Sequence, residues 1–327
     1  MIVTLTPNPS TDRTVTLTGA LERGAVQRAA SVISQAGGKG VNISRACLEA
    51  GVPTTAVLPC AESDAFALDL AAAGIPASLV PVDGDVRVNL TISEPDGTTT
   101  KLNSPGTPAT AALLGELGSR LGDLAARADW VVLAGSLPPD APAGWYADLV
   151  GDLRRVTRVA VDTSDAPLAA LVDRLGEAAP HLMKPNGHEL ASLTGGRLDG
   201  DALEADPDAA AAAAVELLDR GVEALLVTLG GHGAVLVTTD DDGAPVAWHA
   251  TPPPTEVVST VGAGDSSLFG YLLGHERGLG GPDRLALAVA YGSAAAGLPG
   301  TTIPHPGEVH PELVAVRRLR VPRGAAR

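Results

Sequence analysis

The sequence is poor in aromatic residues, cysteine and positive charge, and each shortage narrows the range of functions. Its 327 residues include three Trp, three Tyr and two Phe, so we expect a core packed mainly from Leu, Val and Ala. The two cysteines, Cys47 and Cys60, form neither a disulfide framework nor the C-x-x-C spacing of a zinc or redox site. A net charge of −15 argues against nucleic acid or an anionic membrane as a partner.

Long hydrophobic runs are missing as well. No window is long and apolar enough to span a membrane. The start, MIVTLTPNPSTD, lacks the charged and apolar regions of a signal peptide, so we expect a reducing, cytoplasmic setting. With 45% apolar and 19% charged residues, the chain has the composition of an ordinary globular protein that buries a large core.

Short apolar runs alternate with helical stretches along the chain. Buried strands are indicated at 2–6, 55–59, 130–135, 158–163, 181–186 and 224–230. Most of these runs are followed by a helical pattern, of which 208–221 is an example. This alternation predicts an α/β fold with a mostly parallel central sheet and helices on both faces, in a single domain 1–327.

Two segments, 13–33 and 86–103, favour strands without an intervening helix. The second alternates apolar and polar residues around a Pro-Asp-Gly turn, which is typical of an antiparallel hairpin. We expect the two segments to form one small sheet that stands off the main domain as a lid. The basic tail, 317–327, is interpreted as a frayed end without a role.

Because ligands of open parallel sheets bind beyond the carboxyl ends of the strands, the residues that follow each strand are the candidates for chemistry. The first such junction is QAGGKGVNISRA (35–46), where Gly37, Gly38 and Gly40 surround Lys39 before a helix that starts at Val41. Exposed amides and a lysine there would suit a sugar hydroxyl or a phosphate. A flexible turn with a solvated lysine explains the spacing equally well.

The chain contains neither the P-loop pattern nor G-x-G-x-x-G, and the lack of the second disfavours a nicotinamide dehydrogenase. The second junction, MKPNGHEL (183–190), places Asn186 and Glu189 on one helix face, where they could hold a hydrated Mg²⁺ through water. A capping box is the simpler interpretation of that stretch alone. The third, VTLGGHGAVLV (227–237), either closes a hairpin or lies beside a nucleotide and contributes Thr228.

The fourth junction, TVGAGDSS (260–267), combines glycines with an acidic residue at a helix start. A helix beginning at Gly264–Asp265 would direct the amides of residues 261–265 outward, where they could stabilise a migrating phosphoryl group. Asp265 could accept the proton of an attacking hydroxyl. In a loose phosphoryl-transfer transition state the hydroxyl loses its proton late, so a carboxylate with an ordinary pKa can suffice. An Asp that only capped the helix would need no glycine on either side of Ala263, so we favour the anion site.

Together these stretches resemble the PfkB (ribokinase-like) family of carbohydrate kinases, from TLTPNPSTD (4–12) to AAAGLPGT (294–301). AGGKGVN (36–42) is similar to the first family signature and STVGAGDS (259–266) to the second. TPNP, VRVNL, AGSLPP and MKPN look most like the branch that holds 1-phosphofructokinase and tagatose-6-phosphate kinase. The resemblance implies a ribokinase-like fold, a lid that excludes water and pairs in a homodimer, and ATP and Mg²⁺ as cofactors.

The resemblance also implies a role for individual positions. At the reacting centre it implies Asp265 as the base, with Gly262, Ala263 and Gly264 as the anion hole. For the sugar it implies Asp12, Gly38, Lys39 and Asn42, with Arg87, Ser136 and more weakly Lys101 for the phosphate already on the sugar. For the nucleotide it implies Lys184, Asn186 and Glu189 near the phosphates and Mg²⁺, and Thr228, Gly231, Gly233 and Ser293 nearer the base.

The expected reaction is ATP-dependent phosphorylation of a ketohexose phosphate, with fructose 1-phosphate favoured over fructose 6-phosphate and tagatose 6-phosphate. Some positions depart from the family pattern: Ser10 and Thr11 are polar, 59–70 lacks a G-x-D-x-x-G loop, and LPGT lacks an asparagine near the adenine. A kinase of a neutral sugar or nucleoside would not need Arg87 and Lys39 together. A non-catalytic sugar-phosphate sensor would tolerate loss of the base.

Overall fold

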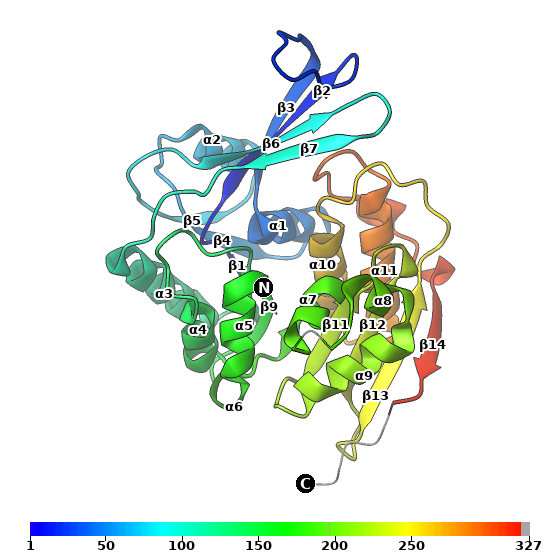
Figure 1. Cartoon of the computed structure of the whole chain (residues 1–327). Coiled ribbons are helices and arrows are strands. Elements are labelled where there is room, and N and C mark those ends of the chain that lie inside the picture. The colour runs from blue at the N-terminus through cyan, green and yellow to red at the C-terminus, as the bar shows by residue number, and fades with distance from the viewer. Residues whose placement is uncertain (196, 322–327) are drawn as a thin grey trace.

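The computed structural model describes residues 1–195 and 197–321, and its strands form two β-sheets (Figure 1). The large sheet has ten strands, in the spatial order β14-β13-β12-β11-β10-β9-β8-β1-β4-β5. Their bounds are β1 Ile2–Leu5, β4 Thr54–Pro59, β5 Ala77–Val80, β8 Trp130–Ala134, β9 Arg158–Asp162, β10 Leu182–Met183, β11 Ala224–Thr228, β12 Ala234–Thr239, β13 Pro245–Thr251 and β14 Ala315–Leu319.

The strands from β5 across to β11 run parallel, and β12, β13 and β14 add an antiparallel edge. The mostly parallel central sheet is thereby confirmed, although the strand expected at 181–186 consists of only two residues. The prediction of a frayed tail is wrong for residues 317–319, because they belong to β14. This strand pairs with β13 from Ala247↔Leu319 to Thr251↔Ala315. The end of that tail, 322–327, lies outside the described residues.

Helices cover both faces of the large sheet, which confirms the predicted layers (Figure 1). Alternate strand residues such as Val3 and Val131 pack with α3 to α7 and α9, whereas Ile2 and Trp130 pack with α1, α10 and α11. The strands are apolar without alternation because both of their faces are buried. The helices are α1 Lys39–Glu49, α2 Ala65–Ala72, α3 Ala111–Ala125, α4 Trp145–Leu153, α5 Asp165–Asp173, α6 Leu175–Ala178, α7 Gly187–Leu193, α8 Gly200–Ala205, α9 Pro207–Leu218, α10 Ala263–Glu276 and α11 Gly281–Ala296, with short 3-10 turns η1 Gly230–His232, η2 Pro306–Glu308 and η3 Pro311–Leu313.

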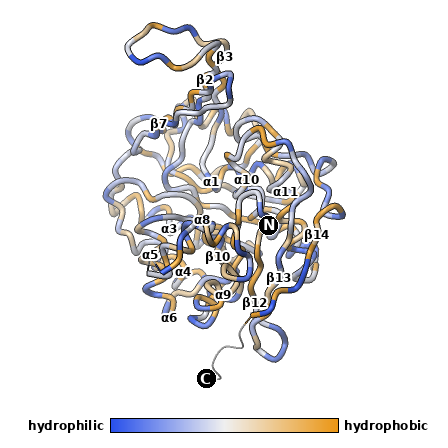
Figure 2. Tube along the Cα trace, turned by 45° about the vertical axis from the view of Figure 1, so that its right-hand side comes forward, coloured by the Kyte–Doolittle hydropathy of each residue, from blue (hydrophilic) through white to orange (hydrophobic). Residues whose placement is uncertain are grey.

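The small sheet has the strand order β3-β2-β6-β7 and stands off the body of the molecule, as Figures 1 and 2 show. Its strands are β2 Ser10–Leu17, β3 Ala29–Gly37, β6 Arg87–Ser93 and β7 Thr99–Asn103. The expected hairpin is confirmed: β6 and β7 are antiparallel, and Gly97 has a φ of 90° in the turn between them. The other strand pair starts three residues before the expected 13–33 and ends four residues after it.

The described residues include no helix with both the length and the apolar character that a bilayer crossing requires.

The fold directs the carboxyl ends of the parallel strands towards the small sheet, because β2 follows β1 directly and β3 leads into α1. Residues far apart in the sequence therefore meet between the two sheets.

Candidate active site

A cavity of about 980 Å³ lies between the two sheets, at the carboxyl ends of the parallel strands. It is lined by residues that follow β1, β8, β9 and β10, by the small sheet and by the starts of α1 and α10. Every candidate site residue except Lys101 lines it: Asp12, Gly38, Lys39, Asn42, Arg87, Ser136, Lys184, Asn186, Glu189, Thr228, Gly231, Gly233, Gly262, Ala263, Gly264, Asp265 and Ser293. Lys101 is exposed on β7.

The helix start that carries Asp265 differs in detail from expectation. Helix α10 begins at Ala263, and its N-cap is Gly262 with a left-handed φ of 81°, so Asp265 is not the cap. Two of the five amides expected to point outward are engaged, because Val261 donates to Ser259 Oγ (3.2 Å) and Ala263 to the Thr260 carbonyl (3.4 Å). Within the described part of the chain, the amides of Gly264 and Asp265 donate to no partner.

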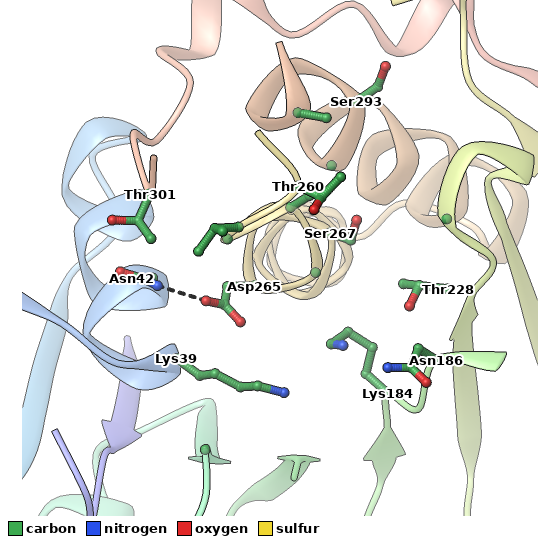
Figure 3. Close-up of a pocket in the computed structure, with 18 of the residues that line it drawn as sticks. Lys39, Asn42, Lys184, Asn186, Thr228, Thr260, Asp265, Ser267, Ser293 and Thr301 are labelled. Carbon is green, nitrogen blue, oxygen red and sulfur yellow. Dashed lines mark hydrogen bonds between the residues drawn. The ribbon is translucent and has the colours of Figure 1, made fainter. Parts of the chain in front are cut away.

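The Asp265 carboxylate is 7% exposed and accepts a hydrogen bond from Asn42 Nδ2 at 2.8 Å (Figure 3). Burial raises the pKa of Asp265 to about 6, and the charge of Asp162 adds to this, although Lys39, Asn42 and Lys184 act in the opposite direction. An ordinary pKa would suffice for the expected proton transfer, and the structure raises the pKa of Asp265 above that value. At neutral pH the group is still mostly ionised, yet it accepts a proton more readily than an exposed aspartate.

The glycines before α1 are required by close packing, and the interpretation as a flexible turn is wrong. A Cβ at Gly38 would lie 2.7 Å from Thr6 Cγ2, and one at Gly40 would lie 2.4 Å from Thr6 Oγ1. A Cβ at Gly37 would lie 2.2 Å from Asp12 Oδ2. Helix α1 starts at Lys39, two residues earlier than expected, with Gly38 as its N-cap at a φ of 110°. The glycines thus let Thr6, Asp12 and the helix start approach one another.

Lys39 is half-buried and pairs with a carboxylate that the sequence did not reveal as a site residue. Asp162, fully buried at the end of β9, contacts Lys39 Nζ through Oδ1 (2.5 Å) and Lys184 Nζ through Oδ2 (3.1 Å). Burial alone would raise the pKa of Asp162, but the two lysines outweigh it and hold that pKa below its ordinary value. The available signal was the position of this aspartate at the carboxyl end of a buried strand.

Polar groups of the small sheet converge at the other end of the cavity. Ser10 Oγ donates to Asp12 Oδ1 (2.8 Å) and accepts from Asn89 Nδ2 (2.9 Å). Burial raises the pKa of Asp12. Arg87 donates to the carbonyls of Ser104 (2.8 Å), Asn8 (3.2 Å) and Pro9 (3.4 Å), which places its guanidinium at the hinge between the two sheets.

Near α7, the capping box that the second junction indicated is confirmed. Asn186 Oδ1 accepts from the Glu189 amide (2.7 Å) and Glu189 Oε2 from the Asn186 amide (2.9 Å), a complete capping box. Both side chains nevertheless line the cavity. No cluster of three or more metal-ligating His, Cys, Asp or Glu occurs among the described residues. The carboxylate of Glu189 and the amide oxygen of Asn186 are groups that could bind a hydrated Mg²⁺ through water.

The glycine turn after β11 likewise closes a hairpin, through η1, and lines the cavity through Gly231 and Gly233. Beyond it, Ser293 Oγ lies 2.6 Å from Thr255 Oγ1. Four buried polar atoms that line the cavity have no hydrogen-bond partner within residues 1–195 and 197–321: Thr6 Oγ1, Asn42 Oδ1, Asn89 Oδ1 and Thr301 Oγ1. Buried polar atoms without partners are costly, which points to a polar ligand in this cavity. Sequence reasoning missed Thr6, Asn89 and Thr301.

Comparison with known proteins places this geometry in a family. Residues 6–307 match the pfkB family of carbohydrate kinases. The chain belongs to this family. Its curated relatives include the 1-phosphofructokinases of Haloferax volcanii, 36% identical over 97% of this chain and 99% of the relative, and of Rhodobacter capsulatus, 36% identical over 93% of each. The 1-phosphofructokinase of Escherichia coli K12 is 32% identical over 84% of this chain and 83% of its own length.

Solved structures agree with the ribokinase-like α/β fold of this pfkB family member. Phosphofructokinase-2 of Escherichia coli, in complex with substrates and products, superposes with a TM-score of 0.83 at 27% identity, over 94% of this chain and 96% of that one. Another structure of the same enzyme is described as its tetrameric inhibited form. The chain is therefore a carbohydrate kinase of the pfkB family, and its cavity holds unpaired helix-start amides beside the buried carboxylate of Asp265.

Proposed function

We propose that this kinase transfers the γ-phosphoryl group of ATP to a hydroxyl of fructose 1-phosphate, which yields fructose 1,6-bisphosphate. The observation that carries the proposal is the position of Asp265, a buried carboxylate of raised pKa, beside the unpaired amides of a helix start. Curated relatives at 32–36% identity bear the name 1-phosphofructokinase. Asp265 accepts the proton of the attacking hydroxyl, while the turn formed by Gly262, Ala263 and Gly264 presents the unpaired amides of Gly264 and Asp265 to the migrating phosphoryl group.

The nucleotide lies towards the antiparallel edge of the large sheet. Lys184, whose ammonium lies 3.3 Å from the position that a Cβ on Gly264 would take, neutralises phosphate charge next to the helix start. Asn186 and Glu189 hold Mg²⁺ through water, and bound Mg²⁺ supplies charge neutralisation of the β- and γ-phosphates. Thr228, Gly231, Gly233 and Ser293 line the part of the cavity that takes the ribose and the base.

The sugar lies under the small sheet, which excludes water as a lid. Asp12 and Asn42 Oδ1 accept hydrogen bonds from its hydroxyl groups, with Gly38 allowing close approach of the backbone. Arg87, helped by Ser136, binds the phosphate that the sugar already carries, and Lys39 adds positive charge nearby. These local cations are needed because the net charge of −15 repels an anionic substrate.

Fructose 6-phosphate is the second candidate substrate, favoured by one observation. Phosphofructokinase-2 of Escherichia coli has been solved in complex with fructose 6-phosphate, and this chain superposes on it with a TM-score of 0.79 at 26% identity. ADP release should be measured with fructose 1-phosphate, fructose 6-phosphate, tagatose 6-phosphate, ribose and adenosine. We expect the highest kcat/KM for fructose 1-phosphate. A higher value for any other acceptor would reassign the substrate.

A non-catalytic sugar-phosphate sensor is the alternative from a different class of protein. Such a sensor would bind fructose 1-phosphate in calorimetry but release no ADP in the presence of MgATP. The complete set of Asp265, the anion site, Asn186 and Glu189 favours the enzyme. Because the reaction consumes ATP, the cytoplasm is the proposed location.

We further propose a homodimer that pairs through the lids. In the register of the small sheet, one face carries Val15, Val32, Leu90, Ile92 and Leu102, opposite to the face with Asp12 and Asn89. Val32 and Leu102 are 56% and 57% exposed. Light scattering should show a dimer that V32E/L102E converts to a monomer, while V156E, at an equally exposed valine elsewhere, leaves the mass unchanged. A tetramer that both variants preserve would contradict pairing through this face.

A further inference from the structure

Lys39 and Lys184, the two lysines of the cavity, share the buried carboxylate of Asp162. This sharing affects Asp265, the other buried carboxylate at the cavity. Asp162 contacts Lys39 at 2.5 Å and Lys184 at 3.1 Å from below the cavity. Lys39 comes from the start of α1 and Lys184 directly follows β10, so the three groups lie 22 to 145 positions apart in the sequence. None of the proposed catalytic steps uses Asp162.

Three carboxylates act electrostatically on Lys39, but among the described residues it makes an ion pair with one of them. Among the described residues its ammonium pairs with Asp162 and with no oxygen of Asp265. Burial would lower the pKa of Lys39, but the charges of Asp162 and then Asp265, together with Glu189, raise it, so Lys39 stays a cation. In the view of Figure 3, Lys39 lies below Asp265 at the cavity, and Lys184 lies to the right of both.

We infer that Asp162 is a positioning residue that holds Lys39 away from Asp265 and so keeps the proton acceptor out of an ion pair. The inference rests on the proposed role of Asp265 as the base. An ammonium bonded to a carboxylate occupies the lone pairs that a hydroxyl proton would reach, and it lowers the basicity of the carboxylate. With Asp162 as the stronger partner, Lys39 remains available for the sugar, and Asp265 keeps only the hydrogen bond from Asn42.

The groups that act on Asp265 come from each element around it. Lys39 and Asn42 approach from α1, Asp162 from the end of β9, and Lys184 from the segment after β10, while Glu189 of α7 acts on Lys39. Replacing Asp162 by asparagine keeps the shape of the side chain but removes the charge that attracts Lys39. The ammonium should then turn to Asp265, which is the remaining carboxylate with the larger electrostatic effect on Lys39.

The test is the pH dependence of kcat/KM for fructose 1-phosphate at saturating MgATP. The wild-type acid limb should lie near pH 6, and D162N should move it down by about one pH unit or more, with a plateau about tenfold or more lower. In D162N/K39M the limb should return to the wild-type position or above it, because the redirected ammonium is gone. The control D206N removes an exposed carboxylate that does not line the cavity and should reproduce the wild-type profile.

An acid limb that D162N leaves in place or moves upward would overturn the inference, as would a limb that stays low in D162N/K39M. Should D162N fail to fold, K39M decides: its limb should lie above the wild-type value, and an unchanged limb would contradict an action of Lys39 on Asp265. Failure of the proposed function looks different. In that case wild-type enzyme releases no ADP with any phosphosugar, or D265N retains wild-type turnover.

Discussion

Replacing Asp265 by asparagine should make the protein more stable at neutral pH. The folded state raises the pKa of this carboxyl from 3.8 to about 6 because the group is buried. The folded protein therefore keeps its proton to a higher pH than the unfolded chain does, and the free energy of unfolding falls as the pH rises from about 4 to 6. This loss of stability is complete above about pH 6 and absent below about pH 3.8.

A shift of about two pKa units corresponds to about 3 kcal/mol, since one unit is about 1.4 kcal/mol. The buried amide keeps part of this cost, so we expect D265N to gain about 1–3 kcal/mol at pH 8, or roughly 2–6 °C in Tm. At pH 5 roughly half of the gain should remain. The measurement is thermal unfolding of wild type and D265N at both pH values.

The control for a general effect of reduced negative charge is D206N, which changes the net charge equally but removes the N-cap of α9. It should lose about 1 kcal/mol at either pH. If D265N were less stable than wild type at pH 8, or gained equally at pH 5 and pH 8, burial would not be what raises the pKa of Asp265.

Two further substitutions test the sugar site and the anion site. R87A should raise the KM for fructose 1-phosphate about 10- to 150-fold, the equivalent of about 1.5–3 kcal/mol for a charge-assisted hydrogen bond. The control R13A, at an exposed arginine bonded to Ser34, should leave that KM unchanged. Equal effects of the two substitutions would remove Arg87 from the sugar site. G262A forces alanine to a φ of 81° at the start of α10 and should lower kcat more than tenfold, with about 1–2 kcal/mol of strain. G278A, at a φ of 70° beyond the end of α10, should cost similar stability but preserve kcat, and a normal kcat for G262A would contradict the anion site.

Much of the fold was predictable because strands buried on both faces leave unbroken apolar runs. IVTL of β1 and WVVLA of β8 are buried at every position. The carboxyl ends of parallel strands meet at one edge, so the glycine-rich junctions could be expected to share a cavity. The edge strand β14 was not predictable in this way, because an exposed strand rich in arginine has the composition of a tail until its pairing with β13 is known.

The site was predictable where a motif is contiguous and not where partners are distant. The stretch 260–267 indicated an anion site by itself, but its cap at Gly262 and the two engaged amides depend on φ angles and on Ser259. The raised pKa of Asp265 depends on burial under neighbouring helices. The role of Asp162 could hardly be predicted from the sequence, because its partners Lys39 and Lys184 lie 123 and 22 positions away.

The most direct test of phosphoryl transfer in this cavity is the turnover number of D265N with fructose 1-phosphate and MgATP. Removal of a general base should lower kcat about 10²- to 10⁴-fold. Calorimetry should show that fructose 1-phosphate still binds with wild-type affinity, because the sugar contacts of Asp12, Asn42 and Arg87 remain. A D265N enzyme with near wild-type kcat would contradict the assignment of Asp265 as the group that accepts the hydroxyl proton.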